Sequence, residues 1–262
     1  MKVVNLSEKN SLLNQYLKEI RDVKIQKDSL RFRRNIERIG ELMAFEVSKA
    51  LNYQKEEVQT PLGVAEVQTI SNRIVLGTIL RAGLPLHQGF LNMFDGAENA
   101  FLSAYRRMGR NVEGQQEIEI VAEYLAAPKL DGKTLILVDP MLATGMSMEV
   151  AYRALLAHGT PATTHLCCTI GTTQAVKYLK KMLPEDHITL WCAAIDPVLN
   201  EKKYIGTPFL QQLHQSAVAC CYRPCHHGIP PRAVLVCNQP ACQHKRQTDI
   251  HHRMPELITV SV

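Results

Sequence analysis

The chain has 262 residues, of which 46% are hydrophobic and 21% charged, so it is long enough for one large α/β domain with its own core. The net charge of +5 is modest and the residues up to 205 are nearly neutral, which argues against nucleic-acid binding as the main function. The sequence has no apolar run long enough for a membrane span and no signal-like or transit-like start, so we expect a cytoplasmic protein without membrane contact.

Two amphipathic helices are predicted near the N-terminus. Apolar residues recur at helical spacing from Ser11 to Val23 and again from Ser29 to Leu51, so both helices should pack on the core. A break at Pro61 follows, and the residues around Val64 and Val67 predict an edge strand.

From residue 73 to residue 194, apolar strands alternate with helices. The predicted strands are 73–80, 100–105, 118–125, 134–137, 163–170 and 188–194, and the predicted helices include 84–93, 148–156 and 172–183. This alternation is typical of an α/β fold with a doubly wound, mainly parallel sheet and helices on both faces. Ligand-binding loops should then lie at the carboxyl ends of the strands.

A loop of small residues follows the strand at 134–137. Asp139 comes directly after this strand, and Thr144, Gly145 and Ser147 precede the next helix. The unpaired N–H groups of a first helical turn and two hydroxyls suit a phosphate, while a carboxylate at the strand end could bind sugar hydroxyls or a metal. The same pattern also fits a capped helix after a turn that binds nothing, and neither a P-loop nor a dinucleotide fingerprint is present.

A second strand end carries a cation. Arg81 and Gly83 follow the strand at 73–80, where an arginine beside exposed N–H groups could hold a pyrophosphate. By itself, the same pattern also fits an arginine that only caps a loop.

Four segments resemble the uracil phosphoribosyltransferase family. Asp139 to Gly145 with Ser147 resembles its phosphoribosyl-pyrophosphate loop, and Ile79 to Leu84 resembles its pyrophosphate loop. Tyr105-Arg106 resembles the start of its flexible loop, and Ile195 to Ile205 resembles the approach to its uracil loop. The resemblance spans roughly residues 10–205.

The resemblance implies transfer of a phosphoribosyl group from phosphoribosyl pyrophosphate to uracil, giving UMP and pyrophosphate, in pyrimidine salvage. It implies that Arg81, Arg106 and Asp139 are catalytic. The substrate-binding residues that it implies are these three with Pro140, Met141, Leu142, Ala143, Thr144, Gly145, Met146, Ser147, Tyr204 and Ile205. It also implies Mg²⁺ as cofactor, GTP as an effector, and a homodimer or higher oligomer.

The sequence departs from the family in the predicted lid and at Met146. Residues 106–116 are polar and contain glycine, as a mobile lid requires. However, Arg107 to Arg110 stand where the family usually has acidic residues, and Met146 stands where it often has glycine.

The resemblance stops after Ile205. There the family carries a Val-Pro-Gly-Leu-Gly-Asp-Ala-Gly-Asp-like segment that recognises the pyrimidine, whereas this chain continues with Gly206 to Gln212. We therefore expect a phosphoribosyltransferase domain at 1–205 and an irregular or disordered Cys/His/Pro-rich tail at 206–262. Three further cysteines, Cys167, Cys168 and Cys192, lie in apolar strands and are expected to be buried thiols, and His87 and His165 are expected to pack structurally.

The tail allows two interpretations. The possible zinc ligands in it are Cys221, Cys225, Cys237 and Cys242, with His226, His227 and His244 nearby. Alternatively, a frameshift or rearrangement has left a tail without an evolved fold. Two other functions therefore stay open beside the enzyme: a regulatory protein that binds phosphoribosyl pyrophosphate without turnover, and a zinc-dependent interaction module.

Overall fold

The structure is a computed structural model that describes residues 1–110 and 116–197, with the backbone alone at residues 104–123. Tyr204, Ile205 and the tail cysteines lie outside the described residues, as does the predicted domain boundary after residue 205.

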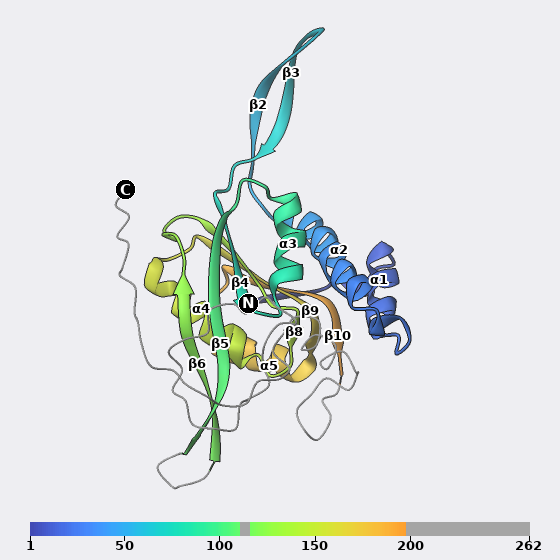
Figure 1. Ribbon diagram of the computed structural model, residues 1–262. Helices are drawn as coiled ribbons and strands as arrows, with labels where there is room; N and C mark the ends of the chain where they lie inside the picture. The colour runs from blue at the N-terminus through green and yellow to red at the C-terminus, as the bar shows by residue number, and fades with distance from the viewer. Residues whose placement is uncertain (111–115, 198–262) are drawn as a thin grey trace, which may run out of the picture. The chain divides into compact units, whose positions relative to one another are not determined.

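The main sheet is built from parallel strands with one antiparallel edge (Figure 1). Its order is β1 (Lys2–Asn5), β10 (Ile188–Asp196), β9 (Thr163–Thr172), β7 (Thr134–Val138), β4 (Ile74–Leu80), β5 (Glu98–Arg110) and β6 (Gln116–Ala126). Among the described strands of this sheet, β5 and β6 form its antiparallel pair, and a short β8 (Met141–Leu142) pairs with β9. The predicted mainly parallel sheet is confirmed; β1, which lies beside β10, was not predicted.

The helices confirm the predicted pattern. They are α1 (Leu12–Arg21), α2 (Ser29–Ser48), α3 (Leu84–Met93), α4 (Met146–Leu155) and α5 (Thr173–Met182), with 3₁₀ turns at Leu6–Glu8, Ile25–Lys27 and Leu156–His158. Side-chain oxygens of Ser11 and Asp28 accept hydrogen bonds from the first turns of α1 and α2 and so fix where these helices begin. Within the described part of the chain, no helix has the length and apolarity to cross a membrane.

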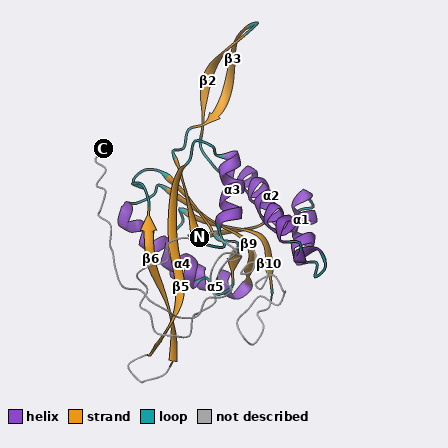
Figure 2. Ribbon diagram, in the orientation of Figure 1, coloured by secondary structure: helices purple, strands orange, loops and turns teal. Residues whose placement is uncertain are grey.

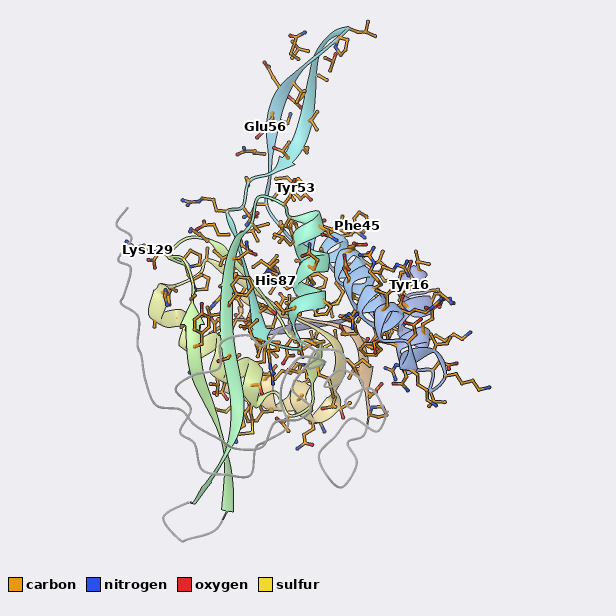
Figure 3. The ribbon with its side chains drawn as sticks, in the orientation of Figure 1. Tyr16, Phe45, Tyr53, Glu56, His87 and Lys129 are labelled. Atoms are coloured by element: carbon orange, nitrogen blue, oxygen red, sulfur yellow. The ribbon has the colours of Figure 1, made fainter. Side chains whose placement is uncertain are left out.

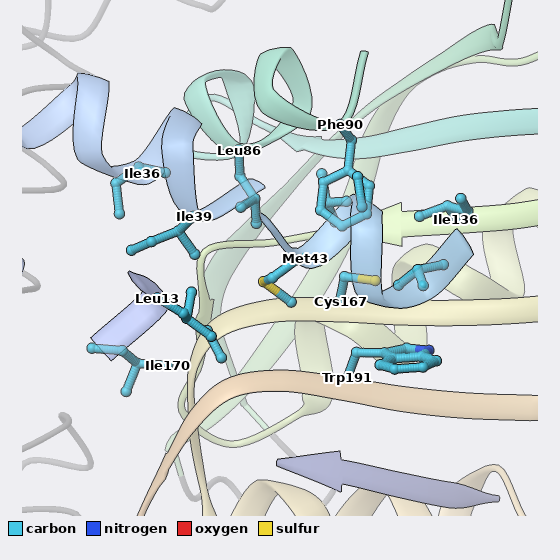
Figure 4. Close-up of a cluster of buried hydrophobic side chains, with 14 of the residues drawn as sticks. Leu13, Ile36, Ile39, Met43, Leu86, Phe90, Ile136, Cys167, Ile170 and Trp191 are labelled. Carbon is cyan, nitrogen blue, oxygen red and sulfur yellow. The ribbon is translucent and has the colours of Figure 1, made fainter. Parts of the chain in front are cut away.

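Helices cover both faces of the sheet, and β7 shows why. Its residues are all buried, and Ile136 (Figure 4) belongs with Val138 to the cluster formed with residues of α1, α2 and α3. The alternate residues, Leu135 and Leu137, point into the layer of α4 and α5. A strand buried on both sides is a continuous apolar run, which is the pattern that predicted it.

The predicted edge strand around Val64 and Val67 is confirmed, but it does not belong to the main sheet. β3 (Gly63–Ile70) pairs with β2 (Tyr53–Thr60) in a separate antiparallel hairpin, whose strands stand apart from the main sheet (Figure 2). The hydroxyl of Thr60 donates to the carbonyl of Gly63 across the turn at 2.6 Å. Most hairpin side chains are exposed, including Glu56 (Figure 3), and such a polar ribbon has little apolar periodicity by which β2 could be recognised.

The predicted lid is in part a regular ribbon. Backbone residues Arg106 to Arg110 continue β5 and pair with Gln116 to Ile120 of β6, while residues 111–115 lie outside the described residues. Polar residues are compatible with a strand here because an antiparallel ribbon can face water.

The strand order reverses between β4 and β7. From β4 the chain proceeds through β5 to β6 on one side, and from β7 through β9 to β10 on the other. Thr78 of β4 lies opposite Val138 of β7, so the carboxyl ends of these strands are neighbours. In open parallel sheets, ligands bind where the strand order reverses.

The predicted buried thiols and structural histidines are confirmed. Cys167, Cys168 and Cys192 are buried and free. His165 accepts a hydrogen bond from the indole N–H of Trp191 at 3.0 Å, and burial lowers the pKa of His165 to about 4, so it stays neutral. His87 on α3 (Figure 3) is 4% exposed and its Nε2 lies 2.8 Å from the Asn99 amide oxygen.

The carboxylate of Glu19 joins α1 to α2. It accepts two hydrogen bonds from Arg31, at 2.9 and 3.0 Å, one from Asn35 at 2.7 Å and one from Gln15 at 3.2 Å. The hydrogen bonds from Arg31, followed by that from Asn35, lower the pKa of Glu19 from 4.5 to about 2. The ionised carboxylate therefore stabilises the fold above pH 4.5, and this contribution is lost as the pH falls toward 2.

We expect Glu19→Gln to lower the free energy of unfolding by about 1–3 kcal/mol at neutral pH, because the buried Asn35 amide and the Arg31 guanidinium lose a charged acceptor. In urea unfolding at pH 7 and pH 3, the difference in the free energy of unfolding between wild type and variant should be smaller at the lower pH. Glu46→Gln removes the exposed Lys49 ion pair and should change stability by less than about 0.5 kcal/mol. A difference for Glu19→Gln that does not depend on pH would contradict the charge-based explanation.

Candidate active site

The loop between β7 and α4 is held at several backbone positions. The N–H of Asp139 donates to the Cys167 carbonyl at 3.0 Å, and the N–H of Ile170 donates to the Pro140 carbonyl at 3.1 Å. Met141 and Leu142 then pair with β9 as β8. The first half of the loop is thus attached to the neighbouring strand before the chain turns into α4.

Gly145 makes the turn into α4. Its φ of 85° lies in the left-handed region that favours glycine. A Cβ here would lie 3.0 Å from Cδ1 of Tyr178 and 3.2 Å from the carbonyl oxygen of Ala175. The backbone therefore approaches α5 closely, and α4 begins at Met146 with the unpaired N–H groups of its first turn.

Asp139 is the charged residue of this loop. Burial raises the pKa of its carboxyl to about 7, and a 3.4 Å hydrogen bond from the N–H of Met141 offsets this only in part. A carboxylate in such a position gains from hydroxyl donors or a nearby cation. It could therefore bind the hydroxyl groups of a sugar.

The loop after β4 places Arg81 at the neighbouring strand end. The Leu80–Arg81 peptide bond is cis, Arg81 is exposed, and α3 begins three residues later at Leu84. The turn has no room for a side chain at Gly83, because a Cβ there would lie 2.1 Å from the hydroxyl oxygen of Thr78. A cation and a second helix N-terminus thus stand beside the first loop.

One pocket gathers most of the predicted site. Its lining residues are Asp139, Met141, Leu142, Ala143, Thr144, Gly145, Ser147 and Met148. Pro140 and Met146 belong to the same loop but do not line the pocket, and Arg81 lies on the adjacent strand end. Met148 was not predicted, because as an apolar residue in a helical pattern it carries no sign of a binding role.

Three predicted residues are placed only in part or not at all. The backbone of Arg106 lies in β5, three residues beyond Ser103, which pairs with the last residue of β4. Its side chain is among those that the structure leaves out, and Tyr204 and Ile205 lie outside the described residues.

Sequence reasoning also missed Thr172. This threonine ends β9, caps α5, and donates from its hydroxyl to the carbonyl of Ala143 in the pocket loop at 2.7 Å. A threonine before an amphipathic helix is a recognisable cap signal, but its second bond joins residues distant in sequence.

A resident metal cage is not present in the described residues, where no group of three or more His, Cys, Asp and Glu side chains could hold a metal ion. Asp139 is the carboxylate that lines the pocket. This arrangement fits Mg²⁺, which commonly binds through one or two carboxylates together with the phosphates of a substrate.

Comparison with known proteins agrees with this geometry. A family model described as uracil phosphoribosyltransferase matches residues 7–209. A uracil phosphoribosyltransferase of Porphyromonas gingivalis is 52% identical over 205 residues, covering 78% of this chain and 93% of that protein. The one of Methanothermobacter thermautotrophicus is 35% identical over 180 residues, covering 68% of this chain and 79% of that protein.

A solved structure has the same fold. The AQ2163 protein from Aquifex aeolicus matches with a TM-score of 0.65 and 27% identity, over 78% of this chain and 91% of that one. The family match contains the pocket loop, the Arg81 loop and every described strand except β1. Together these findings show that the chain belongs to the uracil phosphoribosyltransferase family, whose members are pentosyltransferases.

Proposed function

We propose that this chain transfers the phosphoribosyl group of phosphoribosyl pyrophosphate to uracil, and that the pocket at Asp139–Ser147 and the Arg81 loop bind the donor. The observation that carries this assignment is their adjacency at the reversal of strand order. One ligand with a phosphate at one end and a pyrophosphate at the other would span both loops. Family membership supports uracil as the acceptor.

The 5-phosphate would bind at the start of α4. The backbone N–H groups of Met146 and Ser147 are unpaired in the first turn, and Thr144 and Ser147 add hydroxyl donors. The positive end of the helix dipole favours an anion at the same place.

The ribose would lie beside Asp139, and the pyrophosphate beside Arg81. In the reaction, the bond from C1 of the ribose to the pyrophosphate oxygen breaks and a bond from C1 to a nitrogen of uracil forms, with loss of the proton of that nitrogen. Positive charge develops on the sugar as the pyrophosphate departs, so fixed donors that stabilise the leaving anion lower the barrier. Arg81 would supply these donors, and Arg106 is proposed to do so from β5.

Mg²⁺ would accompany the substrate. When bound, it neutralises negative charge on the pyrophosphate and so makes it a better leaving group. Asp139 is the protein residue that would hold it, together with oxygens of the substrate.

Several proposed features rest on the family resemblance. These are Tyr204 and Ile205 as part of the base pocket, GTP as an effector, and a homodimer or higher oligomer. The same applies to the division into a domain at 1–205 and a tail at 206–262. The comparisons favour the enzyme over the regulatory protein and the zinc module as the function of this chain.

The function is tested by uracil-dependent release of pyrophosphate, measured with the full chain and with a version that carries the family-like terminus in place of the tail. We expect turnover from both, with a lower Michaelis constant for uracil in the second. Binding of phosphoribosyl pyrophosphate without UMP formation, even at high enzyme concentration, would instead establish the regulatory protein.

We expect Arg81→Ala to lower kcat/KM for phosphoribosyl pyrophosphate by roughly 10²- to 10³-fold, because the leaving group loses a preorganised cation. Arg81→Lys should retain part of the activity, since it keeps the charge but loses the two-donor geometry. Arg73→Ala is the matched control, because Arg73 precedes the same strand at its other end. Equal losses in the two alanine variants would argue against a role for Arg81 in the reaction.

Asp139 gives a prediction with opposite effects on stability and binding. The folded pKa of about 7 lies above the ordinary value of 3.8, so this group stabilises the ligand-free fold below pH 3.8 and loses that contribution as the pH rises through 7. Asp139→Asn cannot ionise. It should therefore show a higher free energy of unfolding than wild type at pH 8, and yet bind phosphoribosyl pyrophosphate about tenfold or more weakly.

Urea unfolding between pH 4 and pH 8 and calorimetric titration measure these two effects. Asp95→Asn, which changes an exposed carboxylate, should alter neither. If Asp139→Asn were less stable than wild type at pH 8, the Asp139 carboxylate would have an ionic partner in the ligand-free protein, contrary to its raised pKa.

A further inference from the structure

Helix α5 and its cap residue Thr172 contact the phosphate loop, which we define as Asp139–Ser147, at two places and the first turn of α4 at a third, although none of the α5 residues lines the pocket. The first contact is made by Thr172, which is 1% exposed. Its hydroxyl donates to the carbonyl of Ala143 at 2.7 Å and accepts from the N–H of Ala175 at 3.0 Å. One hydroxyl thus starts α5 and holds the loop, and only a side chain that both donates and accepts can do this.

The second contact lies at the turn of the loop. Gly145 packs against Tyr178, Leu179 and the carbonyl of Ala175, with no room for a methyl group. The left-handed turn that aims the first N–H groups of α4 into the pocket therefore rests directly on α5.

The third contact lies just past the loop, on Glu149 in the first turn of α4. The hydroxyl of Tyr178 donates to Oε2 of Glu149 at 2.5 Å, and Nε of Arg153 donates to Oε1 at 2.8 Å. Both carboxylate oxygens are therefore engaged, and Glu149 is 7% exposed.

The third contact matters for phosphate binding because Glu149 is negatively charged. A carboxylate in the first turn of a helix interacts with the same positive helix end as a bound phosphate does. A released Glu149 would compete with a substrate phosphate and repel it. Tyr178 and Arg153 bind this carboxylate on the α5 side of α4 and so leave the helix N-terminus available.

We propose that Thr172 and Tyr178 are positioning residues that preorganise the phosphate loop, Thr172 by fixing the Ala143 carbonyl and Tyr178 by restraining Glu149. This inference rests on the proposed function, because it assigns the 5-phosphate of the substrate to this loop. It predicts that α5 controls the phosphate end of the ligand and leaves the pyrophosphate end unaffected.

Ribose 5-phosphate and pyrophosphate serve as separate probes for the two ends of the proposed donor site. Each is titrated calorimetrically into the full chain in the presence of magnesium. Thr172→Val should weaken the binding of ribose 5-phosphate about tenfold, which is the effect of losing one buried hydrogen bond that shapes the site. The affinity for pyrophosphate should not change. Thr172→Ser restores the hydroxyl and should bind as wild type does.

Thr173→Val is the neighbouring control. The hydroxyl of Thr173 donates to the carbonyl of Pro197 at 2.9 Å, at the exit of β10 and outside the phosphate loop. This variant should bind ribose 5-phosphate with unchanged affinity. The inference for Thr172 fails if Thr172→Val binds ribose 5-phosphate normally, loses both ligands equally, or is not rescued by serine.

Tyr178→Phe tests the second positioning residue without removing a helix cap. It should weaken the binding of ribose 5-phosphate several-fold. Adding Glu149→Gln should restore the affinity, because the negative charge that Tyr178 restrained is then gone. If the double variant binds no better than Tyr178→Phe alone, the restraint of Glu149 is not what Tyr178 provides. A wild-type chain that binds neither ribose 5-phosphate nor phosphoribosyl pyrophosphate would remove the proposed function, and the inference with it.

Discussion

The parallel pairing of β4 with β7 is the constraint on which the site depends. Because Thr78 lies opposite Val138, the loops that follow the two strands leave the sheet at neighbouring points, one carrying Arg81 and the other Asp139. The chain leaves these strands in opposite directions across the sheet, from β4 to β5 and β6 on one side and from β7 to β9 and β10 on the other. Helices therefore cross both faces of the sheet and leave the space above this pair of strand ends to a ligand.

Burial on both faces keeps this pair of strands in place. Ile136 and Leu137 of β7 lie next to each other in sequence but pack into different layers, under α2 and α4 respectively. Fully burying each such side chain contributes about 1.5–3 kcal/mol, so a shift of β7 would cost contacts in both layers at once. The loops that carry Arg81 and Asp139 start directly at these buried strand ends, so their first residues are fixed by the packing of the strands.

The site itself works against the stability of the ligand-free fold. Burial raises the pKa of the Asp139 carboxyl, so the ionised form is disfavoured in the ligand-free fold. The carboxylate of Glu149 is compensated, because Tyr178 and Arg153 donate hydrogen bonds to both of its oxygens. The carboxylate left without such partners is the one proposed to contact substrate, whereas the other is held away from the helix N-terminus. Functional sites commonly retain an unfavourable group of this kind.

The sequence by itself determined the order of strands and helices from 73 to 194, the buried thiols and the small-residue loop between the strand at 134–137 and the next helix, because apolar periodicity and small residues at strand ends are local signals. It predicted the strand at Val64 but missed its partner β2 and the edge strand β1, since a local pattern does not state which strands will pair. Only the tertiary structure decided that the loops of Arg81 and Asp139 follow neighbouring strands and that Thr172 holds Ala143. These contacts join residues distant in sequence, and strand register and helix packing set them, which no local pattern encodes.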